Sequence, residues 1–443
     1  MKRATLGRLL RHLVALAALA VGPPAAAGGP PSGTLLGPGT AALARGFLPE
    51  EILARYRAGE FLHEVMGARP DTQWTDPAFL AAAGKNRGRY AVSDAGSIVD
   101  RTTGTQPAGI FGPPFPDIRP DDPDAGAKLV WNYFYNSYLL GDDRNVVALS
   151  WIGRHGLDRQ IRTEVWQKFY DGQPFEGTAP PNPRNFLFQQ FVETQYPADL
   201  QGTLSLTWRY RGVSRDTTWA YVPAIRRIRA VAPINRSDGF LGSDMSQDDG
   251  VFFDGKPEDF RWTYVGEAEM LCLYDRAAII EGAHDIRALP GGGWRAVFPP
   301  RPRFGWQDPR AGVVAWAPLA ERTVLVRRPV FVVEGVPRDP YYLYGKIVLR
   351  FEKDTYVGCY NSKSDWKGEV INTYTPLRGA WFRVGESSWR PYTAAQFTLS
   401  QSFKLDRATA SHPYADGPEV PSDSLIPLNP QLLEYEALVR RGR

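Results

Sequence analysis

The stretch from residue 204 to residue 274 limits the fold more than any other part of the chain, because apolar residues alternate there with polar ones. The apolar positions fall in three runs: Leu204, Leu206, Trp208 and Tyr210, then Trp219 and Tyr221, then Phe260, Trp262 and Tyr264. A period of two gives a strand one apolar and one polar face. The sequence therefore predicts neighbouring antiparallel strands with an aromatic face. That face is either half of a packed sandwich or the wall of an apolar cavity.

The N-terminal residues have the pattern of an export signal. Four basic residues precede an apolar run at 13–21, and Ala25, Ala26 and Ala27 provide a site for signal cleavage. We expect residues 1–27 to be a signal peptide that is removed after Ala27. No other run reaches the roughly 18 apolar residues of a membrane span, so we expect the mature protein to be soluble.

The charge of the chain argues against a nucleic-acid partner. The four basic residues of the leader account for the whole formal charge of +4. The mature chain is therefore near neutrality and lacks the positive field that binds phosphate backbones. Hydrophobic residues make up 43% of the sequence, which is enough for a large core.

The chain divides into a short arm and one long domain. Residues 28–48 are rich in Gly, Pro and Ala, and we expect them to be a flexible N-terminal segment. Residues 49–443 are expected to form a single domain, mainly β with a few helices. From residue 145 onward, strand-like runs follow one another without long helices, which favours an antiparallel meander.

The clearest helix is predicted over residues 124–140. Asp124 can cap it, and Val130, Tyr133 and Phe134 belong to an apolar stripe at helical spacing. A helix of this kind among strands must bury its stripe against a sheet. It is either a core helix or a plug across the mouth of a barrel. Shorter helices are predicted over 49–58, 76–84 and 430–441.

Motifs for catalysis, metals and cofactors are weak or missing. The sequence has no HExxH, P-loop, GxSxG or dinucleotide fingerprint, so it predicts no metal site and no cofactor. Cys272 and Cys359 lie in strand-like runs, and in an oxidising compartment they either pair as a disulfide or remain two buried thiols.

One acidic cluster, from Asp244 to Asp254, permits several interpretations. Its spacing departs from the calcium loop of an EF-hand. A hydrolase with paired carboxylates in this loop stays open, because the separation of carboxylates is a three-dimensional quantity. We favour structural ion pairing, and the residues of the expected cluster are Arg226, Arg227, Arg229, Asp248 and Asp249.

Four segments, at 115–138, 217–233, 243–271 and 344–369, together resemble the family called domain of unknown function 1329, which consists of exported bacterial proteins. The most specific signals are Tyr-x-Pro-Ala from Tyr221, and Trp-x-Tyr-Val-Gly from Trp262. The fourth segment is also similar to the closing hairpins of LolA and LolB, which carry lipoproteins. The resemblance implies a LolA-like fold: an incomplete antiparallel β-barrel with a helical lid and a hydrophobic cavity.

The resemblance further implies a periplasmic carrier for a lipid or other hydrophobic molecule. It would work with an RND-type exporter or an outer-membrane partner, in the periplasm or at the outer membrane. The expected cavity wall is Trp208, Tyr210, Trp219, Tyr221, Trp262 and Tyr264, and the expected lid residues are Val130, Tyr133 and Phe134. Two alternatives are a structural adaptor that carries nothing, and a hydrolase that uses the acidic loop.

Overall fold

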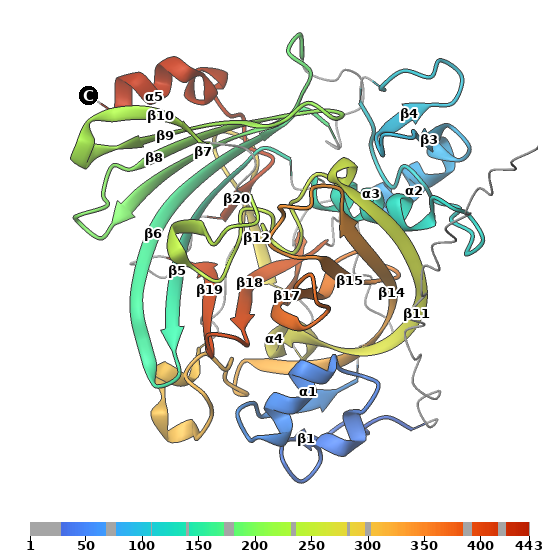
Figure 1. The fold of residues 1–443 in the computed structure, drawn as a ribbon, viewed down its shortest axis with the longest axis vertical. Helices are drawn as coiled ribbons and strands as arrows, with labels where there is room; N and C mark the ends of the chain where they lie inside the picture. Colours follow the sequence, from blue (N-terminus) through green and yellow to red (C-terminus); the bar gives the residue numbers. More distant parts are fainter. Residues whose placement is uncertain are drawn as a thin grey trace, which may run out of the picture.

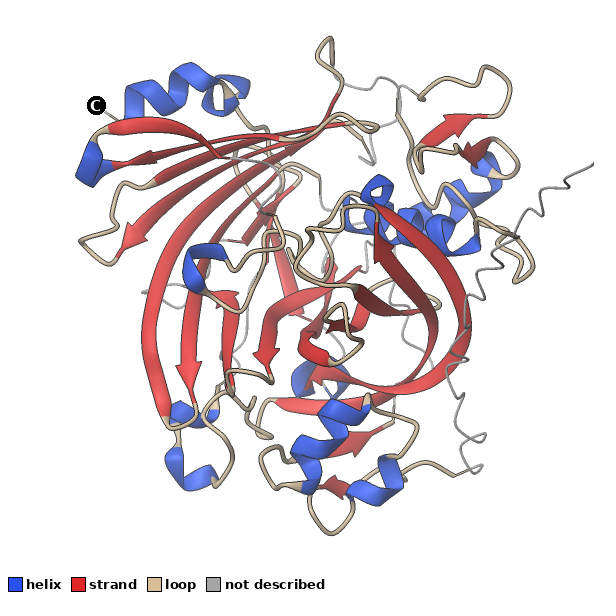
Figure 2. Ribbon diagram, viewed as in Figure 1, coloured by secondary structure: helices blue, strands red, loops and turns tan. Residues whose placement is uncertain are grey.

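The computed structural model describes residues 28–67, 77–107, 109–138, 141–171, 181–231, 236–280, 284–296, 303–383, 392–414 and 422–442. The expected signal peptide, residues 1–27, lies outside the described residues. Strands dominate the described chain, as Figure 2 shows. No helix among the described residues combines the length and hydropathy of a membrane span.

One large, mainly antiparallel sheet organises the molecule (Figure 1). Its first half contains β5 (Asp143–Gly153), β6 (Gly156–Phe169), β7 (Phe186–Tyr196), β8 (Leu204–Tyr210), β9 (Thr217–Val222) and β10 (Arg227–Val231). Its second half contains β11 (Phe260–Asp275), β14 (Thr323–Pro337), β15 (Lys346–Glu352), β16 (Gly358–Ser364), β17 (Val370–Arg383), β18 (Tyr392–Ser402) and β19 (Arg407–Pro413). Each strand pairs with its neighbours in the order β10-β9-β8-β7-β6-β5-β19-β18-β17-β16-β15-β14-β11. The predicted antiparallel meander is therefore confirmed.

The sheet is strongly curved but does not close into a barrel. Short strands extend it: β1 (Leu35–Leu36), β2 (His63–Met66), β12 (His284–Ala288), β13 (Trp294–Ala296) and β20 (Ser422–Ser424). A separate hairpin consists of β3 (Tyr90–Val92) and β4 (Ile98–Asp100). The incomplete barrel that the family resemblance implies is the observed architecture.

The helices are few and short. They are α1 (Glu50–Arg57), α2 (Pro77–Asn86), α3 (Ala125–Tyr138), α4 (Arg276–Ile280) and α5 (Tyr435–Arg441). The longest, α3, packs on β11 and β14. Gly126 permits this approach, because a Cβ at that position would lie 2.9 Å from the backbone of Thr263.

The segment 28–48, which we expected to be flexible, packs into the core. It contains β1 and a 3-10 helix, η1 (Ala41–Ala44), and β1 pairs with β2. Leu36, Ala41 and Phe47 are buried in the same core cluster as residues of β11 and β14. The composition of this segment was misleading, because its few apolar residues are the ones that anchor it.

A long loop, residues 236–259, lies on the inner side of the curve, between the two halves of the sheet (Figure 1). Hydrogen bonds tie it to several strands: Asn361 on β16 donates to the Phe252 carbonyl at 3.1 Å, and Tyr374 on β17 donates to the Gly250 carbonyl at 2.5 Å. The inner side of these strands is therefore covered by the chain's own acidic loop.

The two cysteines form a disulfide between neighbouring parts of the curve. Cys272 lies on β11 and Cys359 on β16, with their Cα atoms 5.5 Å apart and a sequence separation of 87. Both are fully buried. Of the two alternatives that the sequence leaves open, the structure has the bonded one.

Replacing Gly126 with Ala tests the close contact between α3 and β11. The added methyl group would meet the backbone of β11, so we expect the free energy of unfolding to fall by about 1–3 kcal/mol. Gly84→Ala on α2 is the matched control, because nothing lies within 4 Å of its added Cβ and alanine favours a helix. Urea denaturation measures both, and equal stability of the two variants would contradict this account of α3.

Candidate functional site

Strand β8 separates two chemically different faces of the sheet, because its side chains alternate. Arg209 points to the inner side, where it pairs with Asp216 of the β8–β9 turn at 3.0 Å and with Asp254 of loop 236–259 at 3.2 Å. Its neighbour Trp208 points the other way and donates its indole N–H to the Leu433 carbonyl at 2.9 Å. Figure 1 places the C-terminal helix α5 on this outer side, away from loop 236–259.

The outer side of β6–β10 carries a continuous apolar surface, which we call the outer aromatic face. It consists of buried Phe191, Leu204 and Leu206 with the half-buried side chains of Trp166, Trp208, Trp219, Tyr221 and Ile228. The rings of Trp208 and Trp219 meet edge to face with centroids 4.7 Å apart. Tyr210 lies at one end of this surface, its ring 5.3 Å from that of Phe186.

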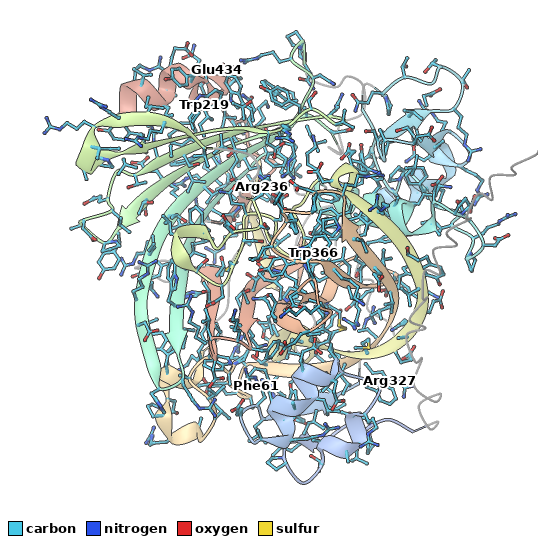
Figure 3. All side chains as sticks on the ribbon, viewed as in Figure 1. Phe61, Trp219, Arg236, Arg327, Trp366 and Glu434 are labelled. Carbon is cyan, nitrogen blue, oxygen red and sulfur yellow. A yellow bond between two sulfur atoms is a disulfide. The ribbon has the colours of Figure 1, made fainter. Side chains whose placement is uncertain are left out.

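The C-terminal segment, residues 430–441, covers this face. It comprises a 3-10 helix, η8 (Pro430–Leu433), followed by α5. Leu433 and Leu438 are fully buried against the outer aromatic face, and Tyr435 meets Trp219 edge to face at 5.4 Å. Figure 3 labels Glu434 of this segment next to Trp219 on β9. Covering the face in this way keeps its rings partly out of water.

The remaining predicted wall and lid residues lie in a different cluster. Tyr133 on α3 stacks on Phe351 at 6.0 Å, and Trp262 meets Phe253 at 5.3 Å. The other members are placed there too: Val130 and Phe134 are buried, and Tyr264 packs at the edge. The prediction of one continuous wall is thus corrected, because Trp208, Tyr210, Trp219 and Tyr221 face outward while Trp262 and Tyr264 face α3.

The acidic loop has other partners than the three arginines we expected. Arg226, Arg227 and Arg229 are exposed on the β9–β10 hairpin, at the edge of the sheet, and no ion pair joins them to a described carboxylate. Asp248 instead pairs with Arg236 at 2.6 Å, and Asp249 pairs with Lys363 on β16. The physical reason is that the loop folds inward, away from the edge strand β10.

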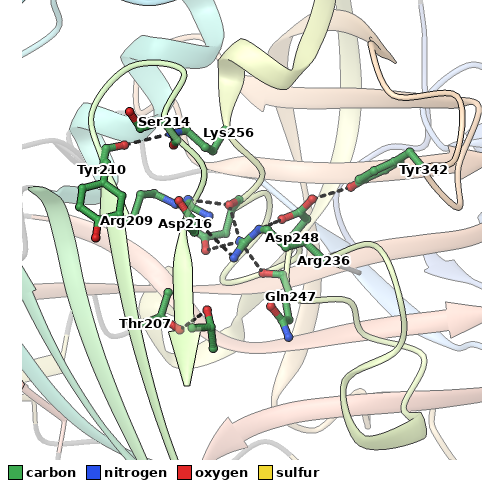
Figure 4. Close-up of polar contacts among 12 residues, drawn as sticks. Thr207, Arg209, Tyr210, Ser214, Asp216, Arg236, Gln247, Asp248, Lys256 and Tyr342 are labelled. Atoms are coloured by element: carbon green, nitrogen blue, oxygen red, sulfur yellow. Dashed lines mark hydrogen bonds and ion pairs between the residues drawn. The ribbon is translucent and has the colours of Figure 1, made fainter. Parts of the chain in front are cut away.

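Every carboxylate of the loop that the sequence singled out has a basic partner. Asp244 pairs with Arg407 at 3.0 Å, and Asp254 pairs with Arg209. Figure 4 shows the centre of this network, where Arg236 bridges Asp216 at 3.2 Å and Asp248. Burial raises the pKa of Asp216, but Arg209 and Arg236 outweigh this effect and the pKa is lowered. The arrangement holds the loop in place by charge.

A second feature is a small cleft beside α3. Its space for water is about 20 Å³, and its lining includes Trp131, Tyr135, Arg211 and Glu258. The Oε1 atom of Glu258 accepts a hydrogen bond from Ser97 at 3.0 Å, and its Oε2 atom has no partner among the described residues. Burial raises the pKa of Glu258 to about 7, although Lys256 opposes the shift. A space of this size fits one water molecule.

The pKa of Glu258 predicts a dependence of stability on pH. Between pH 4.5 and 7 the folded protein keeps a proton on Glu258 that the unfolded chain has lost. The free energy of unfolding therefore falls by about 3 kcal/mol as the pH rises from 4.5 to 7. Glu258→Gln should remove this fall, whereas Glu369→Gln, at an exposed turn, should not. Urea denaturation at several pH values measures the difference between each variant and the wild type. A Glu258→Gln profile parallel to that of the wild type would refute the shift.

The Asp249–Lys363 pair should be essential for the loop, because both side chains are almost fully buried. Lys363→Met leaves a buried carboxylate unpaired and should lower stability by about 3–5 kcal/mol. Adding Asp249→Asn should restore part of this loss. Lys367→Met, an exposed lysine in the next turn, is the control and should change stability by less than about 0.5 kcal/mol. Chemical denaturation of the four proteins tests the pairing.

Sequence reasoning missed the residues that make these contacts. Arg236, Lys363 and Arg407 are isolated basic residues, and the sequence does not indicate which carboxylate each one meets. The sequence predicted that Leu433 and Leu438 belong to a short terminal helix, but it did not indicate which surface they pack against. Among the described residues, no cluster of three or more His, Cys, Asp or Glu side chains is placed to hold a metal.

Residues 51–380 match the model of the family described as "Protein of unknown function (DUF1329)". This chain belongs to the DUF1329 family. The family that the four motifs indicated is therefore confirmed, and the match includes β8, β9 and the acidic loop but ends before the C-terminal segment. No curated protein matches the chain in sequence.

Solved structures similar to this DUF1329 protein are distant in sequence. A DUF1329 family protein from Desulfovibrio piger is 15% identical, with 72% of this chain and 99% of that one covered and a TM-score of 0.46. A putative outer membrane lipoprotein-sorting protein domain from Vibrio parahaemolyticus is 14% identical, with 73% and 100% covered and a TM-score of 0.45. A LolA superfamily protein from Nitrosomonas europaea is 10% identical, with 69% and 96% covered and a TM-score of 0.38.

Proposed function

We propose that this protein is a periplasmic carrier that binds a lipid or another hydrophobic molecule on its outer aromatic face. The observation that supports this proposal is the accumulation of aromatic rings on the face under the C-terminal segment. Trp166, Trp208, Trp219 and Tyr221 are half-buried and belong to one apolar cluster. Rings of this kind offer both an apolar body and a polar tip to an amphiphilic ligand.

Energetics favour reversible binding at such a face. Each methylene that leaves water contributes about 0.8 kcal/mol, but a bilayer offers a similar gain. The ligand then has similar affinity for the protein and for the membrane, so it can move between them. The pairing of Asp244, Asp248, Asp249 and Asp254 with basic side chains supports a structural use of the acidic loop rather than hydrolysis.

We further propose that the carrier works with an RND-type exporter or an outer-membrane protein. Two neighbouring hairpin turns offer a surface for such a partner. Tyr341 is 85% exposed and Trp366 is 52% exposed, and the Trp366 indole donates to the Tyr342 carbonyl at 2.8 Å, which holds the turns together. Exposed aromatic residues of this kind are enriched at protein interfaces.

Native mass spectrometry of protein purified from periplasm tests the carrier function. We expect stoichiometric lipid on the wild type and about tenfold weaker binding by Trp219→Ala, because an aromatic contact is worth about 1.4 kcal/mol. Leu405→Ala removes an exposed apolar side chain elsewhere and should retain the lipid. Protein that is empty but co-purifies with an envelope protein would support the adaptor instead.

A further inference from the structure

We infer that the C-terminal segment occupies the binding site of an acyl group, and that a fatty acid or acyl ester binds the outer aromatic face by displacing it. This inference rests on the proposed function. It also names the ligand class, because the contacts of the segment resemble those that an acyl chain with its carbonyl group would make.

The polar contact at the centre of the face is specific for a carbonyl group. The Trp208 indole and the Gln189 amide both donate to one acceptor, the Leu433 carbonyl oxygen, at 2.9 and 3.0 Å. Gln189 is fully buried, and its own oxygen accepts from the Tyr170 hydroxyl at 2.6 Å, which orients the amide N–H toward the face. Two donors converging from β7 and β8 would bind the carbonyl oxygen of an ester or carboxylic acid equally well.

The apolar contacts beside this point match a hydrocarbon chain. Leu433 and Leu438 reach Phe191, Leu204 and Leu206, and they are the buried leucines of the segment. Aliphatic side chains and methylene groups make the same nondirectional contacts with such a surface. An alkyl chain that follows the carbonyl group can therefore replace both leucines without changing the face.

One end of the site, at Arg184, is basic once the segment leaves. Glu434 of the segment pairs with Arg184, whose guanidinium lies 4.7 Å from the centroids of Phe186 and Trp208. At the other end, Arg441 pairs with Glu193 on β7. Both pairs are part-exposed, so salt and water weaken them. Release of Glu434 frees Arg184 for a carboxylate or another anionic head group.

The segment is also suited to leave. Its helix α5 has seven residues, and a helix of that length has little stability of its own in water. Its order thus depends on the contacts with the outer aromatic face, and elements of this kind open at low free energy. Because the segment and the ligand compete for one surface, weakening the segment must raise the apparent affinity for the ligand.

The experiment measures binding of 11-(dansylamino)undecanoic acid, a fluorescent fatty acid, to full-length variants. Leu438→Ala should bind it about tenfold more tightly than the wild type, since the segment competes less well. Arg440→Ala changes an exposed residue of the same helix and should bind like the wild type. Adding Trp208→Phe to Leu438→Ala keeps a ring but removes one carbonyl donor, and should weaken binding about tenfold.

Amide hydrogen exchange of the wild type gives a second readout that does not depend on variants. Addition of the fatty acid should increase exchange in residues 435–441. If the acid binds the wild type while this exchange and the Leu438→Ala affinity stay unchanged, the displacement is wrong and the carrier function stands. If neither the wild type nor Leu438→Ala binds fatty acid or co-purifies with lipid, the proposed function fails together with this inference.

Discussion

The ion pairs between loop 236–259 and the inner face of the sheet determine the orientation of the aromatic residues. Arg209 is almost fully buried between Asp216 and Asp254, and a guanidinium cannot be buried without such partners. Since side chains on a strand alternate, fixing Arg209 inward forces Trp208 outward, and a shift of one residue would reverse both. The position of the acidic loop therefore creates the outer aromatic face.

Buried ion pairs of this kind contribute specificity more than stability. Removing two charges from water costs several kcal/mol each, and their attraction offsets that loss only when geometry and hydrogen bonds are good. At two of these carboxylates such hydrogen bonds are present: the Ser246 N–H donates to Asp249 at 2.7 Å, and the Tyr342 hydroxyl donates to Asp248 at 2.7 Å. Misplacing the loop would leave several charges unpaired at once. This penalty selects one register for the strands that the loop touches.

The sequence predicted the positions of strands and helices better than it predicted which side of each strand faces the interior, for a physical reason. Period-two alternation identified β8, β9 and β11, and helical spacing identified α3, because both patterns are local. Alternation shows that Trp208 and Arg209 lie on opposite faces, but which face is interior depends on what packs there. The aromatic ring of Trp208 suggested that this residue faces the interior. The structure instead has Arg209 on the inner side, because its buried charge needs the carboxylates there. Partners such as Asp249 and Lys363, 114 residues apart, leave no local signal.

The proposed outer binding face makes other demands on the curved sheet than a hollow interior would. A carrier with a hollow interior must open to release its ligand, whereas a face covered by the end of the chain can exchange its occupant without moving the sheet. The inner loop and the Cys272–Cys359 disulfide can then keep the curve rigid. A resident segment also lowers the apparent affinity for a ligand by the fraction of time that it covers the face. A short segment can therefore bring the apparent affinity of the protein for its ligand close to that of a bilayer. The contacts between the aromatic rings and the ligand need not be weaker for this.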